Sequence, residues 1–266
     1  DITDPSNMGP SKFLWEFSHP DMGKTIGQPA IVALPNGRFA VVVTSGYRTT
    51  QQSSARVWFL DAANGSVIKR FDISTTGDLG APLLADTNGD QIADKLYVGD
   101  TTGKLWRADI SDAVPGNWVT PTLMFTATDG TNPQPITAPL SSTFNEKGQH
   151  MVLFGTGSYM FIGDNEVPNS PQIQSFYAII DSGETVTRSN LLAQEILSER
   201  TVGNFQGRSL SNNAISNQKG WYLDLAWKSG RGGPGARGER VVSKATLRSD
   251  RVTFTTLTPS ADPCAS

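Results

Sequence analysis

Residues 81–109 read APLLADTNGDQIADKLYVGDTTGKLWRAD, and this stretch decides the fold. It contains three short apolar runs, P-L-L-A, K-L-Y-V-G and K-L-W-R-A, which are separated by turns rich in Asp, Asn, Thr and Gly. Runs of this length between such turns are typical of β-strands. The stretch therefore predicts three short strands, and Trp106 places a large aromatic residue on the third.

The same layout occurs in two further segments of the chain. The three copies open at Pro29, Pro82 and Pro139, which lie 53 and 57 residues apart. Each copy reads as a strand, a turn and a second strand that ends in small residues, namely Ser45-Gly46, Gly99-Asp100 and Gly155-Thr156-Gly157. A third strand follows, which carries Trp58, Trp106 or Tyr177 and ends at Asp61, Asp109 or Asp181. We interpret the three aromatic residues as packing residues, because large aromatic side chains bury much area between sheets.

Four short strands in a repeat of ~40–50 residues are the signature of a propeller blade. The sequence therefore predicts an all-β fold, a β-propeller with about three complete four-stranded blades and a partial blade at each end. We expect Phe13–Phe17 to be the last strand of an earlier blade. Arg240–Lys244 and Arg251–Leu257 are expected to be the first two strands of a further blade. Either the chain is part of a larger propeller, or its partial ends meet each other.

Residues 1–266 are thus expected to form one partial propeller domain, with a flexible N-terminal lead at 1–12 and a flexible Gly- and Arg-rich loop at 229–240. A long insertion, Phe161–Gln174, separates two strands of the third repeat. In Asn190–Arg200 the apolar residues stand at helical spacing, which predicts a short helix.

A calcium site is predicted in the loop of the second repeat, residues 86–94. Its oxygen ligands occupy odd-numbered loop positions and are the side chains of Asp86, Asn88, Asp90 and Asp94 with the backbone carbonyl of Ile92. Three carboxylates pointing toward one centre would repel one another without a cation, and Ca²⁺ takes 6–8 oxygens at about 2.3–2.6 Å. Position 12 is Tyr97 rather than the Glu of an EF-hand, and both flanks are strand-like. Alternatively, Asn88-Gly89 is a strong signal for a tight hairpin that needs no metal.

Bulk properties narrow the possible functions. The net charge of −3 gives no basic footprint for nucleic acid, and no run approaches the ~18 apolar residues of a membrane span. With only two histidines and no G-x-S-x-G motif, the sequence favours a binding module over an enzyme. The single cysteine, Cys264, either pairs with a group outside the chain or is a free thiol. The chain opens at Asp1 without an apolar signal core, so either a signal was removed or the chain is a piece of a longer polypeptide.

Taken in order, several stretches of the sequence resemble the PilY/PilC family of type IV pilus biogenesis factors and pilus-tip adhesins. The matching stretches are FLWEF (13–17), TIGQP (25–29), DTNGDQIADKLYVGD (86–100), GKLWRAD (103–109), PQPITAP (133–139), VLFGTGSY (152–159), QSFYAIID (174–181), GWYLDL (220–225) and VTFTTLTPSADPC (252–264). The resemblance implies a modified seven-bladed propeller, of which this chain is about the C-terminal half. It also implies the calcium ligands Asp86, Asn88, Asp90, Ile92 and Asp94. Some family members carry an Arg-Gly-Asp integrin motif, whereas this sequence has Arg237-Gly238-Glu239.

The resemblance further implies a calcium-binding propeller that regulates pilus extension and retraction, and hence twitching motility, and that helps attachment. Its expected partners are pilus subunits such as minor pilins, or host and surface receptors, and its expected place is the cell surface at the pilus tip, associated with the outer membrane and reached through the periplasm. Two alternatives stay open. One is an enzyme resembling the quinone-dependent propeller dehydrogenases, and the other is a metal-free extracellular scaffold.

Overall fold

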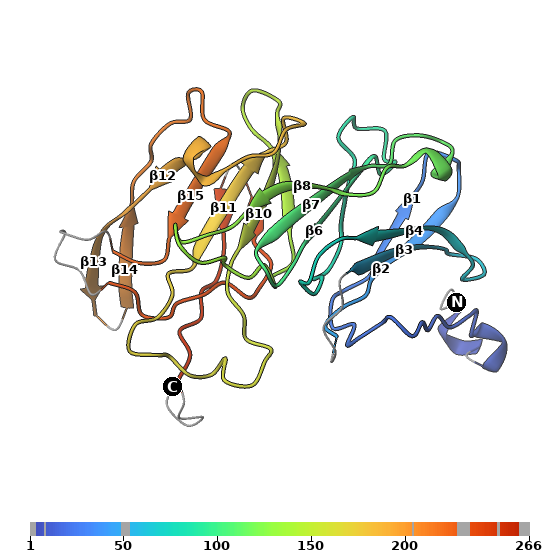
Figure 1. Ribbon diagram of the computed structural model, residues 1–266, viewed down its shortest axis with the longest axis horizontal. Helices are drawn as coiled ribbons and strands as arrows, with labels where there is room; N and C mark the ends of the chain where they lie inside the picture. Colours follow the sequence, from blue (N-terminus) through green and yellow to red (C-terminus); the bar gives the residue numbers. More distant parts are fainter. Residues whose placement is uncertain are drawn as a thin grey trace. The chain divides into compact units, whose positions relative to one another are not determined.

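The computed structural model of the chain describes residues 4–7, 9–48, 54–203, 205–227, 235–248 and 251–260. Within these ranges the regular structure is almost entirely β (Figure 1). The exceptions are short 3-10 turns, η1 (Pro5–Asn7), η2 (Pro10–Lys12), η3 (Pro115–Asn117) and η4 (Arg188–Asn190). The chain divides into two compact units: Asp1–Leu96 with Ala108–Pro121, and Tyr97–Arg107 with Thr122–Ser266. Among the described residues, no helix is long and apolar enough to cross a membrane.

The first sheet has the predicted layout of one repeat. Its strands are β1 (Ala30–Ala33), β2 (Phe39–Thr44), β3 (Ala55–Asp61) and β4 (Val67–Ile73). Each strand pairs antiparallel with the next one along the chain. Pro29 stands directly before β1, where its missing N–H costs no ladder bond. Gly37 forms the first turn at φ 77°, a conformation that glycine adopts without strain.

The second sheet confirms the three strands predicted from residues 81–109 and adds a fourth. It consists of β5 (Leu83–Ala85), β6 (Lys95–Gly99), β7 (Lys104–Asp109) and β8 (Thr122–Thr126), in that order. Residues of this sheet belong to both compact units, because β6 and β7 each change unit within the strand.

The third sheet is built from strands that are distant in sequence. Its order is β12-β15-β11-β10-β9, with β9 (Ser141–Phe144), β10 (His150–Gly155), β11 (Ser175–Ile180), β12 (Leu192–Gln194) and β15 (Gly220–Asp224). The predicted insertion Phe161–Gln174 is confirmed, since it lies between β10 and β11. A second insertion separates the third strand, β11, from the fourth, β15. It holds η4, β12 and a hairpin formed by β13 (Ile196–Val202) and β14 (Phe205–Leu210).

The helix predicted at Asn190–Arg200 is wrong. The segment contains β12 and the first part of β13, and β12 pairs in parallel with β15. Leu191 and Ile196, which suggested a helical face, are both buried. Short apolar runs have no secure period, so the backbone bonds offered by β15 decide the conformation here.

The predicted strands at the two ends are also corrected. Residues 13–17 belong to no strand. At the other end the hairpin is formed by β16 (Thr246–Arg248) and β17 (Arg251–Thr253), so the first strand begins six residues later than Arg240. Arg240 itself makes only an isolated bridge to Leu257. The stretch Arg240–Lys244 is the lead-in to this hairpin. Its apolar and basic residues did not distinguish such a lead-in from a strand.

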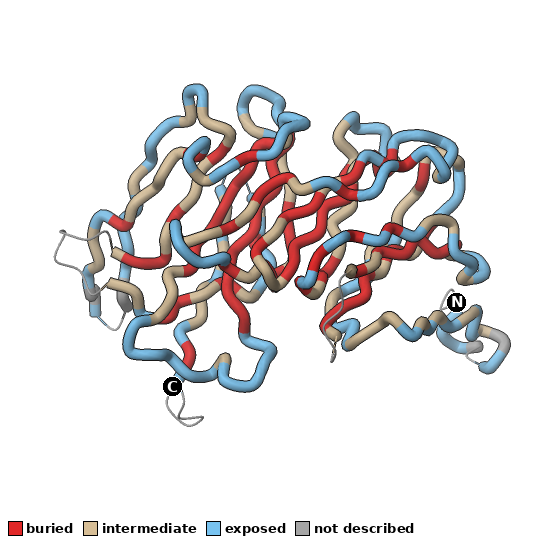
Figure 2. Tube along the Cα trace, viewed as in Figure 1, coloured by how far each residue is buried: buried red, intermediate tan, exposed pale blue. Residues whose placement is uncertain are grey.

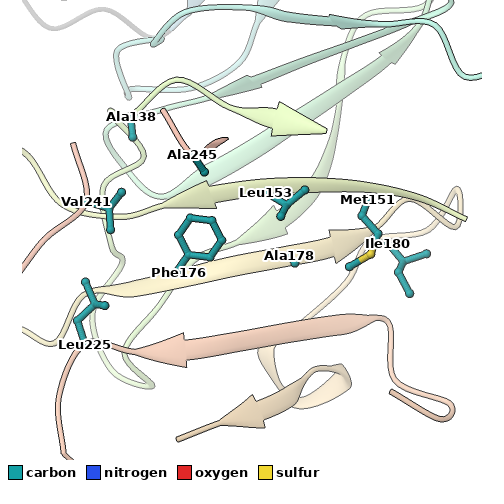
Figure 3. Packing of buried hydrophobic residues seen from close by; sticks show 9 residues of the cluster. All are labelled: Ala138, Met151, Leu153, Phe176, Ala178, Ile180, Leu225, Val241 and Ala245. Atoms are coloured by element: carbon teal, nitrogen blue, oxygen red, sulfur yellow. The ribbon is translucent and has the colours of Figure 1, made fainter. Parts of the chain in front are cut away.

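The core of the second unit lies along β10 and β11, both of which are buried on both faces (Figure 2). Figure 3 shows its nine side chains, which are Ala138, Met151, Leu153, Phe176, Ala178, Ile180, Leu225, Val241 and Ala245. Phe254 stacks on Phe176 with ring centroids 4.2 Å apart. The three aromatic residues of the third strands, Trp58, Trp106 and Tyr177, are all buried, which confirms their interpretation as packing residues.

Three predictions fall partly or wholly outside the described residues. Cys264 lies outside them, and so do residues 229–234, the first half of the Gly- and Arg-rich loop. The flexibility of this loop and of the lead at 1–12, and the single-domain organisation of residues 1–266, stay predictions.

Candidate metal centre

The loop predicted to bind calcium joins β5 to β6 and has a strand on each side, as expected. It spans nine residues, 86–94, between two strands that are neighbours in the second sheet. A two-residue hairpin at Asn88-Gly89 would have brought the strands together at those residues, so the tight turn is wrong, while the metal-free reading of the loop stays open. The loop is therefore larger than chain reversal alone requires.

The first half of the loop is wound around the side chain of Asp86. Asp86 Oδ1 accepts the backbone N–H of Gly89 at 2.6 Å and of Asn88 at 3.2 Å, and Oδ2 accepts the N–H of Gln91 at 2.7 Å. Asn88 Oδ1 then accepts from the N–H of Asp90, and Asp90 Oδ1 from that of Ile92. Three side chains at alternate positions thus set the path of the loop backbone.

Two residues of the loop adopt positive φ. Gly89 has φ 86°, and Gln91 has φ 68° as the one non-glycine residue in this region of φ among those described. Gln91 is the sixth residue of the loop, where EF-hand calcium loops require a sharp turn and carry Gly. A left-handed conformation at a long side chain costs on the order of 1 kcal/mol, which the bonds to Asp86 offset.

Asp94 closes the loop from a buried position, with 7% of the residue exposed. Its carboxylate accepts the N–H of Thr87 at 3.0 Å and the Thr87 hydroxyl at 2.8 Å. Its backbone is bonded on both sides, with N donating to the carbonyl of Ala85 and the carbonyl accepting from the N–H of Ile110. Asp94 therefore connects the loop to the start of β6 and to the end of β7.

The loop favours the charged form of Asp86. Desolvation by itself would raise the pKa of Asp86, but the N–H groups of Gln91, Gly89 and Asn88 hold it below its ordinary value. The predicted ligands are all oxygens, the donor type that hard cations such as Ca²⁺ prefer. Within the described residues, no three His, Cys, Asp or Glu side chains are gathered closely enough to hold a metal ion. The donor types therefore suit calcium, but the structure does not gather the carboxylates of Asp86, Asp90 and Asp94 into one cluster. Asp90 lies on the exposed side of the loop and Asp94 at its buried base.

A second polar cluster was not recognised in the sequence. The hydroxyl of Tyr97 donates to Asp181 Oδ2 at 2.6 Å, and Arg107 pairs with the other carboxylate oxygen. His150 Nδ1 lies 3.2 Å from the same hydroxyl. The hydroxyl has one proton, and the short bond to Asp181 uses it, so Nδ1 carries the proton of the His150 contact. The recurring Asp at the end of the third strand was the available signal, but its partners come from other strands.

The Arg237-Gly238-Glu239 segment has a structural role. Glu239 is 5% exposed and pairs with Arg208 of β14 at 2.7 Å, while Arg237 pairs with Glu199 of β13 at 3.0 Å. A buried, paired carboxylate is not accessible to a receptor, which agrees with the absence of an Arg-Gly-Asp sequence.

Comparison with known proteins places residues 15–217 in the family model described as the PilY1 beta-propeller domain. A type IV pilus biogenesis factor PilY1 homolog of Xylella fastidiosa (strain Temecula1) is 31% identical over 299 residues, covering 100% of this chain and 20% of that protein. PilY1 of Pseudomonas aeruginosa (strain PAO1) is 30% identical over 316 residues, covering 100% of this chain and 26% of that protein. These relatives are named as biogenesis factors rather than as enzymes.

Among solved structures, the crystal structure of the Pseudomonas aeruginosa PilY1 C-terminal domain superposes with a TM-score of 0.84 at 26% sequence identity. The match covers 97% of this chain and 61% of that chain. The present chain thus spans about a fifth to a quarter of the length of the curated relatives quoted above.

Proposed function

The chain belongs to the PilY1 β-propeller domain family and has its all-β propeller fold, and from this premise we propose that it serves type IV pilus biogenesis as a calcium-binding, non-enzymatic propeller. In this proposal it acts by protein–protein contact with pilus subunits or surface receptors, on the cell surface at the pilus tip. Calcium loading of the 86–94 loop regulates pilus extension and retraction. The observation that supports the proposal is a loop with oxygen-bearing side chains at positions 1, 3, 5 and 9, wound around Asp86 and closed by the buried Asp94.

The residues that would hold the ion are Asp86, Asn88, Asp90 and Asp94, with the backbone carbonyl of Ile92. The ion supplies charge neutralisation for three carboxylates. Asp86 already fixes the turn through backbone N–H groups, so it contributes to a preformed first half of the site. Asp94 accepts from Thr87 and is joined through its backbone to Ala85 and Ile110. A change at its carboxylate is therefore transmitted to the ends of β5, β6 and β7, which is the structural basis of the proposed regulation.

Calorimetric titration of the purified chain with Ca²⁺ tests the ligand assignment. We expect one binding event, which Asp90→Ala and Asp94→Ala each abolish because they remove a charged ligand. The matched control is Asp129→Ala. Asp129 also accepts backbone N–H groups of its own turn, from Thr131 and Asn132, but it has no other acidic side chain at alternate positions. Undiminished affinity in Asp90→Ala and Asp94→Ala would overturn the assignment.

The biological part of the proposal is tested separately, in cells that express the full-length parent protein. We expect Asp90→Ala to alter surface piliation and twitching motility, and Asp129→Ala to leave both unchanged. If Asp90→Ala abolishes calcium binding in the purified chain but piliation and motility are normal, the calcium site stands and the regulatory role is refuted.

A further inference from the structure

Four apolar residues in succession are exposed where the chain leaves β10 and enters the long insertion. Tyr159, Met160, Phe161 and Ile162 are 45%, 37%, 45% and 108% exposed. The last value means that the side chain of Ile162 stands clear of the rest of the protein. Single exposed apolar residues are common, but a contiguous group of them marks a contact surface. We call residues 159–162 the apolar tip, and Figure 2 shows this part of the insertion as exposed.

The side chain of Asp164 holds the apolar tip in one shape. Its Oδ2 accepts the hydroxyl of Ser158 at 2.7 Å and the N–H groups of Met160 and Phe161, each at 2.8 Å. The N–H of Asp164 donates in turn to the carbonyl of Phe161 at 3.1 Å, and Gly163 completes the turn at φ 92°. Because the turn is already formed, a partner does not have to order the backbone of the tip on binding.

The segment before the last hairpin anchors this turn to the body of the protein. Arg240 Nη1 donates to the carbonyl of Ser158 at 2.8 Å and to that of Asp164 at 3.0 Å. A Cβ on Gly238 would lie 2.8 Å from Val167 Cγ1, so the insertion packs closely on the backbone there. All of these residues belong to the same compact unit. The apolar tip is therefore a fixed projection of that unit.

The hydrogen bonds of the tip suit an apolar surrounding. The N–H groups of Met160 and Phe161 and the carbonyls of Ser158 and Phe161 all have partners within the protein. A peptide group that leaves water without a partner costs free energy, and these groups can leave water with their bonds kept. The side chains are also of the kinds that enter a membrane interface. Phenylalanine and aliphatic residues reach the acyl chains, and tyrosine stays at the level of the headgroups.

Size and charge favour a lipid surface over a protein as the partner. A stable protein–protein interface uses about 20–30 residues on each side, whereas the tip supplies four. A bilayer requires no matching pocket, and its binding strength follows from the apolar area that enters it. Residues 159–174 contain Asp164 and Glu166 but no Lys or Arg. These charges do not attract anionic headgroups, so the tip fits a zwitterionic bilayer.

We propose that the apolar tip is a lipid-contact site, which inserts Phe161 and Ile162 into the surface of a zwitterionic bilayer. Tyr159 and Met160 lie at the level of the headgroups in this arrangement. The insertion brings only apolar side chains and internally bonded peptide groups out of water. The site is separate from the 86–94 loop, so its binding to lipid does not require calcium.

Co-sedimentation with phosphatidylcholine vesicles tests the proposal. We expect the chain to bind at millimolar lipid, and Ile162→Asp to lower the bound fraction at least about tenfold, because a carboxylate is costly to move into the interface. Ile162 is fully exposed, so the substitution removes no packing contact. Val119→Asp is the matched control, since Val119 is 71% exposed in another loop. Asp90→Ala should bind vesicles as the unsubstituted chain does, which separates this site from the calcium site.

A fluorophore that responds to its surroundings shows which part of the protein enters the lipid. It is attached to Ile162→Cys or to Glu146→Cys, in both cases with Cys264→Ser. Glu146 stands before the start of β10, whereas the tip follows the end of that strand, so the two labels lie beyond opposite ends of β10. We expect phosphatidylcholine vesicles to raise the emission of the label at residue 162 and to leave that at residue 146 unchanged.

Three results overturn the proposal. One is an equal bound fraction for Ile162→Asp and the unsubstituted chain, which includes the case that neither binds. Another is binding that requires phosphatidylglycerol in the vesicles and is lost at high salt, because that is adsorption by charge. The third is a dimer of the unsubstituted chain in sedimentation that Ile162→Asp dissociates, which assigns the tip to a second copy of the protein.

Discussion

The glycines that end β6 and β10 show how a single residue lets a later segment of the chain pack against a strand. The sequence showed that each second strand ends in small residues such as Gly99 and Gly155, but it did not show why glycine is needed there. The structure supplies the reason, because the side chains of Ile136 and Val241 lie where a Cβ would stand. The constraint comes from packing against a segment dozens of residues away, so nothing local in the sequence reveals it.

Replacing Gly155 by alanine should lower the stability of the fold. We expect Gly155→Ala to lower the free energy of unfolding by about 1–3 kcal/mol, because the new Cβ would overlap Val241 and force the lead-in to shift. Gly116→Ala is the control, since the nearest atom to its added Cβ is 3.8 Å away. It should change stability by no more than about 0.5 kcal/mol. Urea unfolding of both variants measures the difference, and equal stability would show that Val241 gives way freely.

Acid sensitivity is predicted at Asp181. Burial alone would raise the pKa of Asp181, but Tyr97, the N–H of Gly183 and Arg107 hold it below its ordinary value. A lowered pKa in the folded state means that the charged form stabilises the fold above about pH 4, and that this stabilisation is lost as the pH falls below that value.

We therefore expect Asp181→Asn to cost about 3–5 kcal/mol at pH 7, because it leaves the largely buried Arg107 without its charge partner. The cost should be smaller at pH 3 than at pH 7, because the stabilisation by the charged form is lost progressively as the pH falls below about 4. Denaturant unfolding at both pH values gives the comparison. An equal cost at pH 7 and pH 3 would show that the charge of Asp181 contributes nothing.

At the scale of elements, Arg188 of η4 fastens the second insertion to the third sheet. Its Nη2 donates to both carboxylate oxygens of Asp224 at 2.6 and 2.7 Å, and its Nη1 donates to the carbonyl of Thr128 at 2.8 Å. The guanidinium carbon also stands 3.8 Å from the ring centroid of Tyr222. Burial raises the pKa of the neighbouring Tyr177 to about 12, so its hydroxyl stays neutral beside the cation.

Arg188→Lys should loosen this attachment while keeping the charge. A lysine cannot form the two-pronged bond to Asp224 or stack on Tyr222, because both depend on the planar guanidinium. We expect faster hydrogen exchange of the amides in β12 and β15, by at least about tenfold, with unchanged exchange in β2 and β3 of the other compact unit. If the amides of β12 and β15 exchange at the same rate in Arg188→Lys and in the unsubstituted chain, Arg188 does not hold these strands.

How far the elements could be predicted depended on how local their causes are. The strands β5, β6 and β7 and the loop 86–94 followed from turn residues and apolar runs within 29 residues. By contrast, β15 pairs with β11 across some forty intervening residues, and only the fold brings them together. The segment 190–200 was misassigned for the same reason, since its partner β15 lies beyond the hairpin β13–β14.

The loop that carries the candidate site was predictable from the sequence, its hydrogen-bonded scaffold was not, and its ligand set stays a prediction. Oxygen-bearing side chains at loop positions 1, 3, 5 and 9 predicted Asp86, Asn88, Asp90 and Asp94 as ligands from the sequence alone. The left-handed backbone at Gln91 was not predictable, because a residue other than glycine adopts it only where several hydrogen bonds enforce it. The hydrogen bonds from Thr87 to Asp94 were not predictable either.

At the scale of the whole molecule, calcium should act as a stabilising ligand of the folded chain. An ion that binds the folded state alone, at about 100 times its dissociation constant, adds about 2.7 kcal/mol. For a chain of this size that corresponds to a rise in melting temperature of roughly 5–10 °C. The loop joins β5 to β6, so the gain should extend beyond the loop to the cooperative unfolding of these strands.

The most direct measurement is therefore a thermal melt of the purified chain in millimolar calcium and in excess chelator, with Asp90→Ala measured alongside. We predict a higher melting temperature with calcium for the unsubstituted chain and no difference for Asp90→Ala. Identical melting curves of the unsubstituted chain in calcium and in chelator would contradict the claim that residues 86–94 bind calcium.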